Sequence, residues 1–188
     1  LFCMDVFSHG LWTGALAGVA NKKMAKPLKM SWSIFWGMMP DVLAFAPMTV
    51  WTFWSLAFGN RDIVDMSYHE GNAVQSIYPA LFNFTNSVYN VTHSLAIFLM
   101  AFALAYAIFG RPIWEMGGWL LHILIDIPTH SAQFFPTPFL WPFSDWKFDG
   151  MPWSEPQFLI INWALLACVY YLFLRKRRRA KKLTAESF

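Results

Sequence analysis

The sequence predicts an all-α membrane protein, a polytopic helical bundle of about five helical units with a Pro/Trp-rich loop at the membrane interface. Hydrophobic residues make up 57% of the 188 residues and charged residues only 13%, which is about half the charged fraction of a soluble domain. Residues 157–174, QFLIINWALLACVYYLFL, are long enough to cross a bilayer. The basic run RKRRRAKK follows directly, which is typical of a spanning helix that ends in the cytoplasm.

Apolar runs and the breaks between them predict the helices. The predicted helices occupy residues 7–20, 31–46, 91–110, 113–127 and 157–174. Small residues in the first allow close helix packing. Pro40 predicts a kink or break in the second helix just before Asp41, and Pro128 ends the fourth. The apolar stretch 48–59 is either a continuation of the second helix or a separate interfacial helix.

Two longer segments differ from the helices in composition. Residues 60–90 form the most polar internal stretch and predict a loop with short helices. Residues 134–156 are rich in Pro and Trp, which favours an irregular segment at the membrane interface. We expect a single membrane-embedded domain over residues 1–174 and a basic cytoplasmic tail over residues 175–188.

The distribution of positive charge predicts the topology. Eleven of the fourteen Lys and Arg lie in residues 22–29 and 175–182, so both segments should face the cytoplasm. A nucleic-acid partner is not expected, because a basic run directly after a span is a topology determinant. Alternating spans then put the loops 60–90 and 128–156 on the outer side. The ionisable residues of the helices converge on that side, with Asp41 about 15 Å deeper along its helix.

The segment HILIDIPTH, residues 122–130, places ionisable groups in an apolar helix. His122 and Asp126 are four residues apart and share a helix face, a spacing that suits metal ligands or a simple Asp–His hydrogen bond. A charge inside a span is costly unless it is compensated. Imidazoles and carboxylates around a divalent cation remove that cost, and a mixed N/O set suits zinc, manganese or ferrous iron better than calcium.

Six residues are candidate metal ligands. They are His9, Asp41, His93, His122 and Asp126, with His130 at the edge. Six exceed the needs of one tetrahedral zinc and favour two ions bridged by a carboxylate.

Several candidates also have a purely structural interpretation. His9 could be an interfacial residue at a helix start, and Asp41 could cap a helix that begins after the proline. His93 could hydrogen-bond a neighbouring helix, and His130 could be an ordinary loop residue. Glu70, in the segment SYHEG, is more typical of a solvated loop but is also a candidate general base.

The order of these motifs resembles a known family. FSHGLWTGALAG, GMMPD, THS, HILIDIPTH and WPFSD are similar to the motifs of the bacterial inner-membrane metal-dependent hydrolases, described as LexA-regulated, and more distantly to zinc-dependent phospholipase C. The resemblance extends to about residue 146 and implies that the first five candidate ligands occupy motif positions. Family members usually carry a basic stretch before THS, where this chain has NFTNSVYNV.

The expected function is that of an integral-membrane hydrolase acting on a phosphoester of a lipid or lipid-linked substrate through a metal-activated water. Asp126, His93 and Glu70 are the candidate catalytic residues, and membrane lipid is the expected partner. The resemblance implies the bacterial inner membrane, and the topology predicted from the basic segments puts the site on the extracytoplasmic side. Two alternatives are a non-catalytic membrane subunit with a structural metal site and a metal or proton transporter. Ligands gathered at one membrane end disfavour the transporter.

Overall fold

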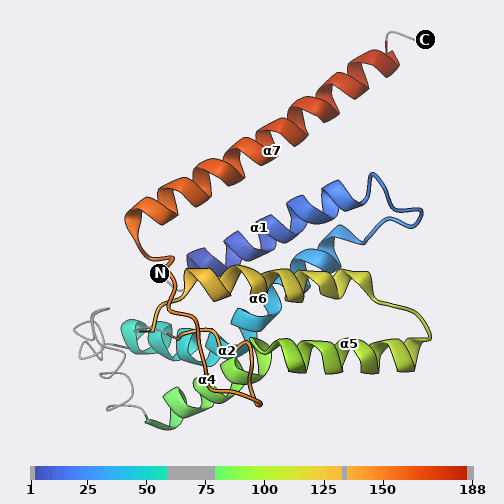
Figure 1. Cartoon of the computed structure of the whole chain (residues 1–188). Coiled ribbons are helices and arrows are strands. Elements are labelled where there is room, and N and C mark those ends of the chain that lie inside the picture. Colours follow the sequence, from blue (N-terminus) through green and yellow to red (C-terminus); the bar gives the residue numbers. More distant parts are fainter. Residues whose placement is uncertain (1–2, 59–78, 133–134, 186–188) are drawn as a thin grey trace.

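The computed structural model describes residues 3–58, 79–132 and 135–185. Within these ranges all regular elements are helices, which confirms the all-α class (Figure 1). The α-helices are α1 (Cys3–Ala20), α2 (Met30–Ala57), α4 (Pro79–Thr92), α5 (Leu95–Phe109), α6 (Gly117–Thr129) and α7 (Pro156–Ala185), and a 3-10 turn, η2 (Trp114–Met116), precedes α6. The described chain therefore has six α-helices where the sequence predicts about five helical units.

Fewer helices than expected are long enough to cross a membrane. Among the described residues, α2 and α7 meet the length and hydropathy required, and α4 with α5 makes a third span if the bent pair counts as one. Helix α6, predicted as a span, has 13 residues. At the helical rise it is about 20 Å long, against about 30 Å of hydrocarbon. These helices are compatible with membrane association.

Two helices continue where the sequence predicts a break. Helix α2 runs through Pro40 and Pro47 to Ala57, so the stretch 48–57 continues the second helix. A proline removes one backbone hydrogen bond, and neighbouring groups in a helix bundle can compensate for that loss. Helix α7 continues through the basic run to Ala185, because Lys and Arg are good helix formers. Most of the predicted tail is therefore helical.

The predicted third helix is two helices that meet at an angle of 61°. Residues 79–90, from the segment expected to be a loop with short helices, belong to α4, and the break falls at His93 and Ser94. The Ser94 hydroxyl accepts the Ile97 amide at 3.3 Å and so caps α5. The Trp119 indole donates to the Thr92 carbonyl. The Ser94 side chain at the break and the Trp119 side chain from α6 thus satisfy backbone groups that the break exposes.

Helix α2 is central to the bundle and packs against α1, α4 and α6. The crossing with α6 is very close, because a Cβ on Gly118 would lie 2.4 Å from the Ser33 carbonyl oxygen. Helices α1 and α7 run in the same general direction, so the segment after α1 and the end of α7 lie toward the same end of the molecule (Figure 1).

The described residues 135–155 form no helix, which confirms the irregular Pro/Trp-rich segment. Its far end is bound to the end of α6 by backbone hydrogen bonds. The amide of Gly150 donates to the His130 carbonyl at 2.8 Å, and that of Met151 donates to the Pro128 carbonyl at 3.0 Å. Near its start, the Phe139 carbonyl accepts the Leu95 amide at 3.0 Å. The segment thus joins the end of α6 to the α4–α5 break.

Candidate metal centre

Four of the six candidate ligands form one buried group. Asp41 comes from the middle of α2, His93 from the α4–α5 break, and His122 and Asp126 from one face of α6. One ligand atom of each residue lies within 4.8 Å of those of the other three, and this group could hold a metal ion. None of the four residues is more than 4% exposed.

The spacing of the four ligand atoms suits tetrahedral coordination. His122 Nε2 is 3.0 Å from Asp126 Oδ2 and 3.5 Å from Asp41 Oδ1. His93 Nε2 is 3.2 Å from Asp126 Oδ2 and 3.3 Å from Asp41 Oδ1. The two Nε2 atoms are 3.0 Å apart. Bonds of about 2.0–2.1 Å to zinc give a tetrahedron with edges of about 3.3 Å, so these five separations match the edges closely.

Hydrogen bonds behind the two histidines set their tautomers. His122 Nδ1 lies 2.8 Å from the Gly37 carbonyl oxygen, which can only accept, so Nδ1 carries a hydrogen. His93 Nδ1 lies 3.1 Å from the Tyr89 carbonyl oxygen and is in the same way a donor. A neutral imidazole that donates from Nδ1 has a lone pair on Nε2. Such backbone contacts are typical of metal-binding histidines.

The two Nε2 lone pairs therefore face each other and two carboxylate oxygens. Four acceptors at 3.0–3.5 Å repel one another unless a cation lies between them. Protonating one histidine would supply a single N–H to three surrounding acceptors, and protonating both would bring two N–H groups together at His93 and His122. A divalent cation accepts all four lone pairs at once, so the residues fit a metal ion.

The second oxygen of Asp126 faces two further histidines. His9 Nε2 is 2.9 Å from Asp126 Oδ1, and His130 Nδ1 is 3.8 Å from the same oxygen. His130 Nδ1 also lies 3.4 Å from Thr137 Oγ1 and 3.5 Å from the Tyr89 hydroxyl. The Asp126 carboxylate thus connects the four-residue group to His9 and His130.

The other candidate residues of the sequence analysis lie outside the four-residue group. His9 and His130 are buried beside the four-residue group but are not members of it. Glu70, the candidate general base, lies outside the described residues. Asp145, the acidic residue of the motif WPFSD, is exposed.

Three supporting residues were not anticipated. The Tyr89 ring stacks on His93 with centroids 3.8 Å apart. The Thr92 hydroxyl lies 2.9 Å from His93 Nδ1, and Gly37 supplies the carbonyl for His122. Tyr89 precedes His93 by four residues, and that spacing is a signal that could have found it. Gly37 carries no comparable signal, because a backbone carbonyl from another helix leaves no mark in the sequence.

Comparisons with protein-family models, with curated proteins and with solved structures give no match to this chain. The resemblance to membrane metal-dependent hydrolases therefore rests on the motifs alone and stays a prediction.

Proposed function

We propose that this chain is an integral-membrane, metal-dependent hydrolase that cleaves a phosphoester of a lipid or lipid-linked substrate. The observation that carries the proposal is the group of four ligand atoms at metal-binding separations, with a carboxylate that reaches beyond them to His9. Structural zinc sites are usually built from Cys and His, whereas His and carboxylate together are typical of catalytic sites. The two Asp and two His of this group therefore favour catalysis.

Zinc is the proposed ion, with manganese and iron as alternatives that the same ligands accept. Asp41, His93, His122 and Asp126 would hold the first ion. A centre with two ions would share Asp126, because its Oδ2 contacts His93 and His122 while its Oδ1 lies 2.9 Å from His9 Nε2.

When bound, the metal lowers the pKa of a water toward neutrality and polarises the phosphoryl group. His9 Nε2 lies 2.9 Å from Asp126 Oδ1, and this pair could hold a proton and pass it to a leaving group. The Gly37 and Tyr89 carbonyls orient the two histidines, which keeps their Nε2 atoms directed at the metal position.

The proposed topology has both basic segments in the cytoplasm and the metal centre toward the extracytoplasmic side. It is supported by the direction of α1 and α7, whose later ends lie toward the same end of the molecule (Figure 1). A bacterial inner membrane is part of the proposal through the motif resemblance. Membrane lipid is then both the surrounding medium and the source of substrate.

A structural metal site in a non-catalytic membrane subunit is the second candidate. It is favoured by burial, because the four ligands are at most 4% exposed and a tetrahedral ion would have every position filled by protein. The two functions differ in one property. A hydrolase needs a coordination position that exchanges with water or substrate, and a structural site does not.

The test uses the full chain purified in detergent and reconstituted with zinc, manganese or cobalt. We expect about one equivalent of metal or two, and metal-dependent release of a phosphorylated head group from solubilised phospholipid. Chelation of the metal and the substitution His93→Ala should each abolish release of the head group. Adding zinc or manganese after chelation should restore it. The control Asp145→Asn, at an exposed carboxylate, should leave release unchanged.

The cobalt-loaded protein separates the two candidates. Binding of inorganic phosphate at an open position changes the visible spectrum of the cobalt. Tightly held metal with no release and no spectral change would establish the structural site in place of the hydrolase. Absence of bound metal would refute both.

A further inference from the structure

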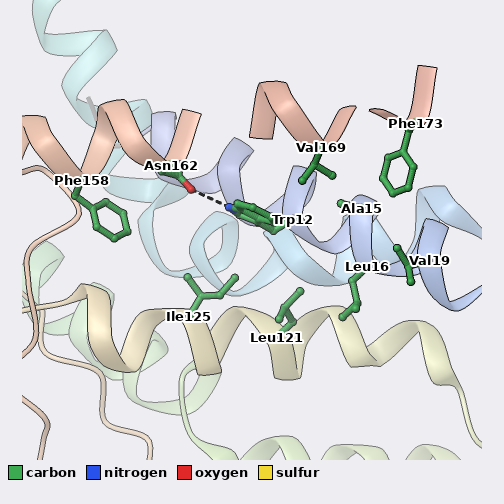
Figure 2. A pocket seen from close by; sticks show the side chains of 10 residues that line it. All are labelled: Trp12, Ala15, Leu16, Val19, Leu121, Ile125, Phe158, Asn162, Val169 and Phe173. Carbon is green, nitrogen blue, oxygen red and sulfur yellow. Dashed lines mark hydrogen bonds between the residues drawn. The ribbon is translucent and has the colours of Figure 1, made fainter. Parts of the chain in front are cut away.

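An apolar groove of about 510 Å³ runs between α1, α6 and α7 (Figure 2). We call it the α1/α7 groove. It is lined by Trp12, Ala15, Leu16, Val19, Leu121, Ile125, Phe158, Asn162, Val169 and Phe173. Its two polar lining side chains bond to each other, since the Trp12 indole donates to the Asn162 side-chain oxygen at 2.8 Å. The remaining wall is hydrocarbon and suits an apolar occupant.

The groove is long and narrow. It extends from Phe158 and Ile125 at one end to Val19 and Phe173 at the other (Figure 2). The fifteen residue steps from Phe158 to Phe173 correspond to about 22 Å of helix. A helix of that length, about 10–12 Å across with its side chains, would need roughly 1,700–2,500 Å³, against about 510 Å³ in the groove. The groove is therefore too small to enclose a helix and suits a single hydrocarbon chain.

Positive charge gathers at the Val19–Phe173 end. The Lys22 Nζ lies 5.4 Å from the centre of the Phe173 ring, a cation–π contact with a lining residue. Lys22 and Lys23 are exposed, as is Lys176, which follows Phe173 by three residues and so lies near it on the same helix face. A chain in the groove would bring its polar end to these lysines.

The flank of the groove faces away from protein. Only 6% of the apolar window of α7 is buried inside the described structure. A helix this apolar and this exposed is suited to contact with lipid. An occupant can therefore enter sideways from the bilayer.

We propose that the α1/α7 groove binds one anionic phospholipid, with an acyl chain along its apolar lining and the phosphate at Lys22, Lys23 and Lys176. Basic pockets between membrane helices on the cytoplasmic side recognise acidic head groups in this way. The site is separate from the metal centre. Leu121 and Ile125 line the groove, whereas His122 and Asp126, each one position further, lie about 100° around α6.

Lipid retention by the full chain in detergent tests the site. The protein is mixed with equal amounts of dioleoyl-phosphatidylglycerol and dioleoyl-phosphatidylcholine, and the retained lipid is counted by native mass spectrometry. We expect one phosphatidylglycerol, held at least tenfold in preference to phosphatidylcholine. Lys22→Gln should weaken retention about fivefold, the effect of one lysine beside an acidic head group. Lys26→Gln, in the same exposed basic segment, is the matched control and should have a smaller effect.

Substitutions that fill the groove with a large side chain provide a second test of the same lipid retention. Leu16→Trp places a large ring in it and should abolish retention of phosphatidylglycerol, and Val19→Trp should do the same from the charged end. Both positions are about half exposed (53% and 47%), so the fold should tolerate them. Leu104→Trp, at a 60% exposed position on α5, is the control and should retain the lipid.

Three results would overturn the proposal. The first is equal retention of both lipids, and the second is unchanged retention in both groove variants. The third is a dimer that dissociates in Leu16→Trp, which would make a second copy of the chain the occupant. None of these results bears on the hydrolase proposal, because no groove residue belongs to the metal centre.

Discussion

Substituting Gly118 by alanine should separate α6 from α2 and weaken the metal centre. A Cβ at this position would lie 2.4 Å from the Ser33 carbonyl oxygen and 2.9 Å from the Gly37 amide nitrogen. Both contacts are with backbone, which cannot rotate away. Ordinary contacts of a Cβ begin at 3.4 Å, so the helices must move apart by about 1 Å.

The displacement should affect both stability and metal binding. Overpacking of this kind costs about 1–3 kcal/mol of unfolding free energy. Gly118 lies one helical turn before His122, whose Nδ1 donates to the Gly37 carbonyl at 2.8 Å. A shift of about 1 Å stretches this bond past the range of a hydrogen bond. Loss of such a supporting contact typically lowers metal affinity by about 10–100-fold.

The matched control is the neighbouring residue. A Cβ on Gly117 meets nothing within 4 Å, and the backbone there is right-handed helical. Gly117→Ala should therefore retain wild-type metal affinity and gain about 0.4–1 kcal/mol of stability. Thermal unfolding of the metal-free protein in detergent and competition with a zinc chelator measure the two effects. If both variants behave alike, the close helix crossing does not support the metal centre as we describe it.

Three further predictions address the site, the last helix and the topology. His122→Ala and Asp126→Ala should each lose bound metal while the protein keeps its helical circular dichroism, and full metal occupancy in the double variant would refute the centre. Asn162→Leu removes two hydrogen bonds from α7 to α1 and should lower stability by about 1–3 kcal/mol without changing metal content. In a background without the native cysteines, an impermeant maleimide applied to intact cells should label Lys147→Cys and leave Ser187→Cys unlabelled; labelling of both from outside would refute the topology.

The sequence predicted the helices best where apolar runs end in clear signals. The first helix ends at Ala20, and the third ends at Gly110, which adopts the left-handed conformation that glycine favours. The break before α5 was not predicted. It depends on the Trp119 indole and the Phe139 carbonyl, which come from distant segments. A continuous apolar run cannot reveal partners of this kind.

The sequence predicted the part of the candidate site that depends on spacing within one helix. His122 and Asp126 share a helix face, so their spacing alone predicted that they act together. Asp41 and His93 were added by threading the spans through a membrane, and the four-residue group they complete is consistent with that reasoning. The connection of Asp126 to His9 and His130 through its second oxygen depends on side-chain orientation, which sequence spacing does not determine.

The separation of α7 from the metal centre has a consequence for biosynthesis. All six histidine and aspartate residues of the centre and its surroundings precede residue 131, and α7, which packs on α1, supplies none of them. Chains fold from the N-terminus as they emerge from the ribosome. The four residues that could hold a metal ion can therefore come together while α7 is still being synthesised. The last helix then packs on α1 after the four-residue group has formed.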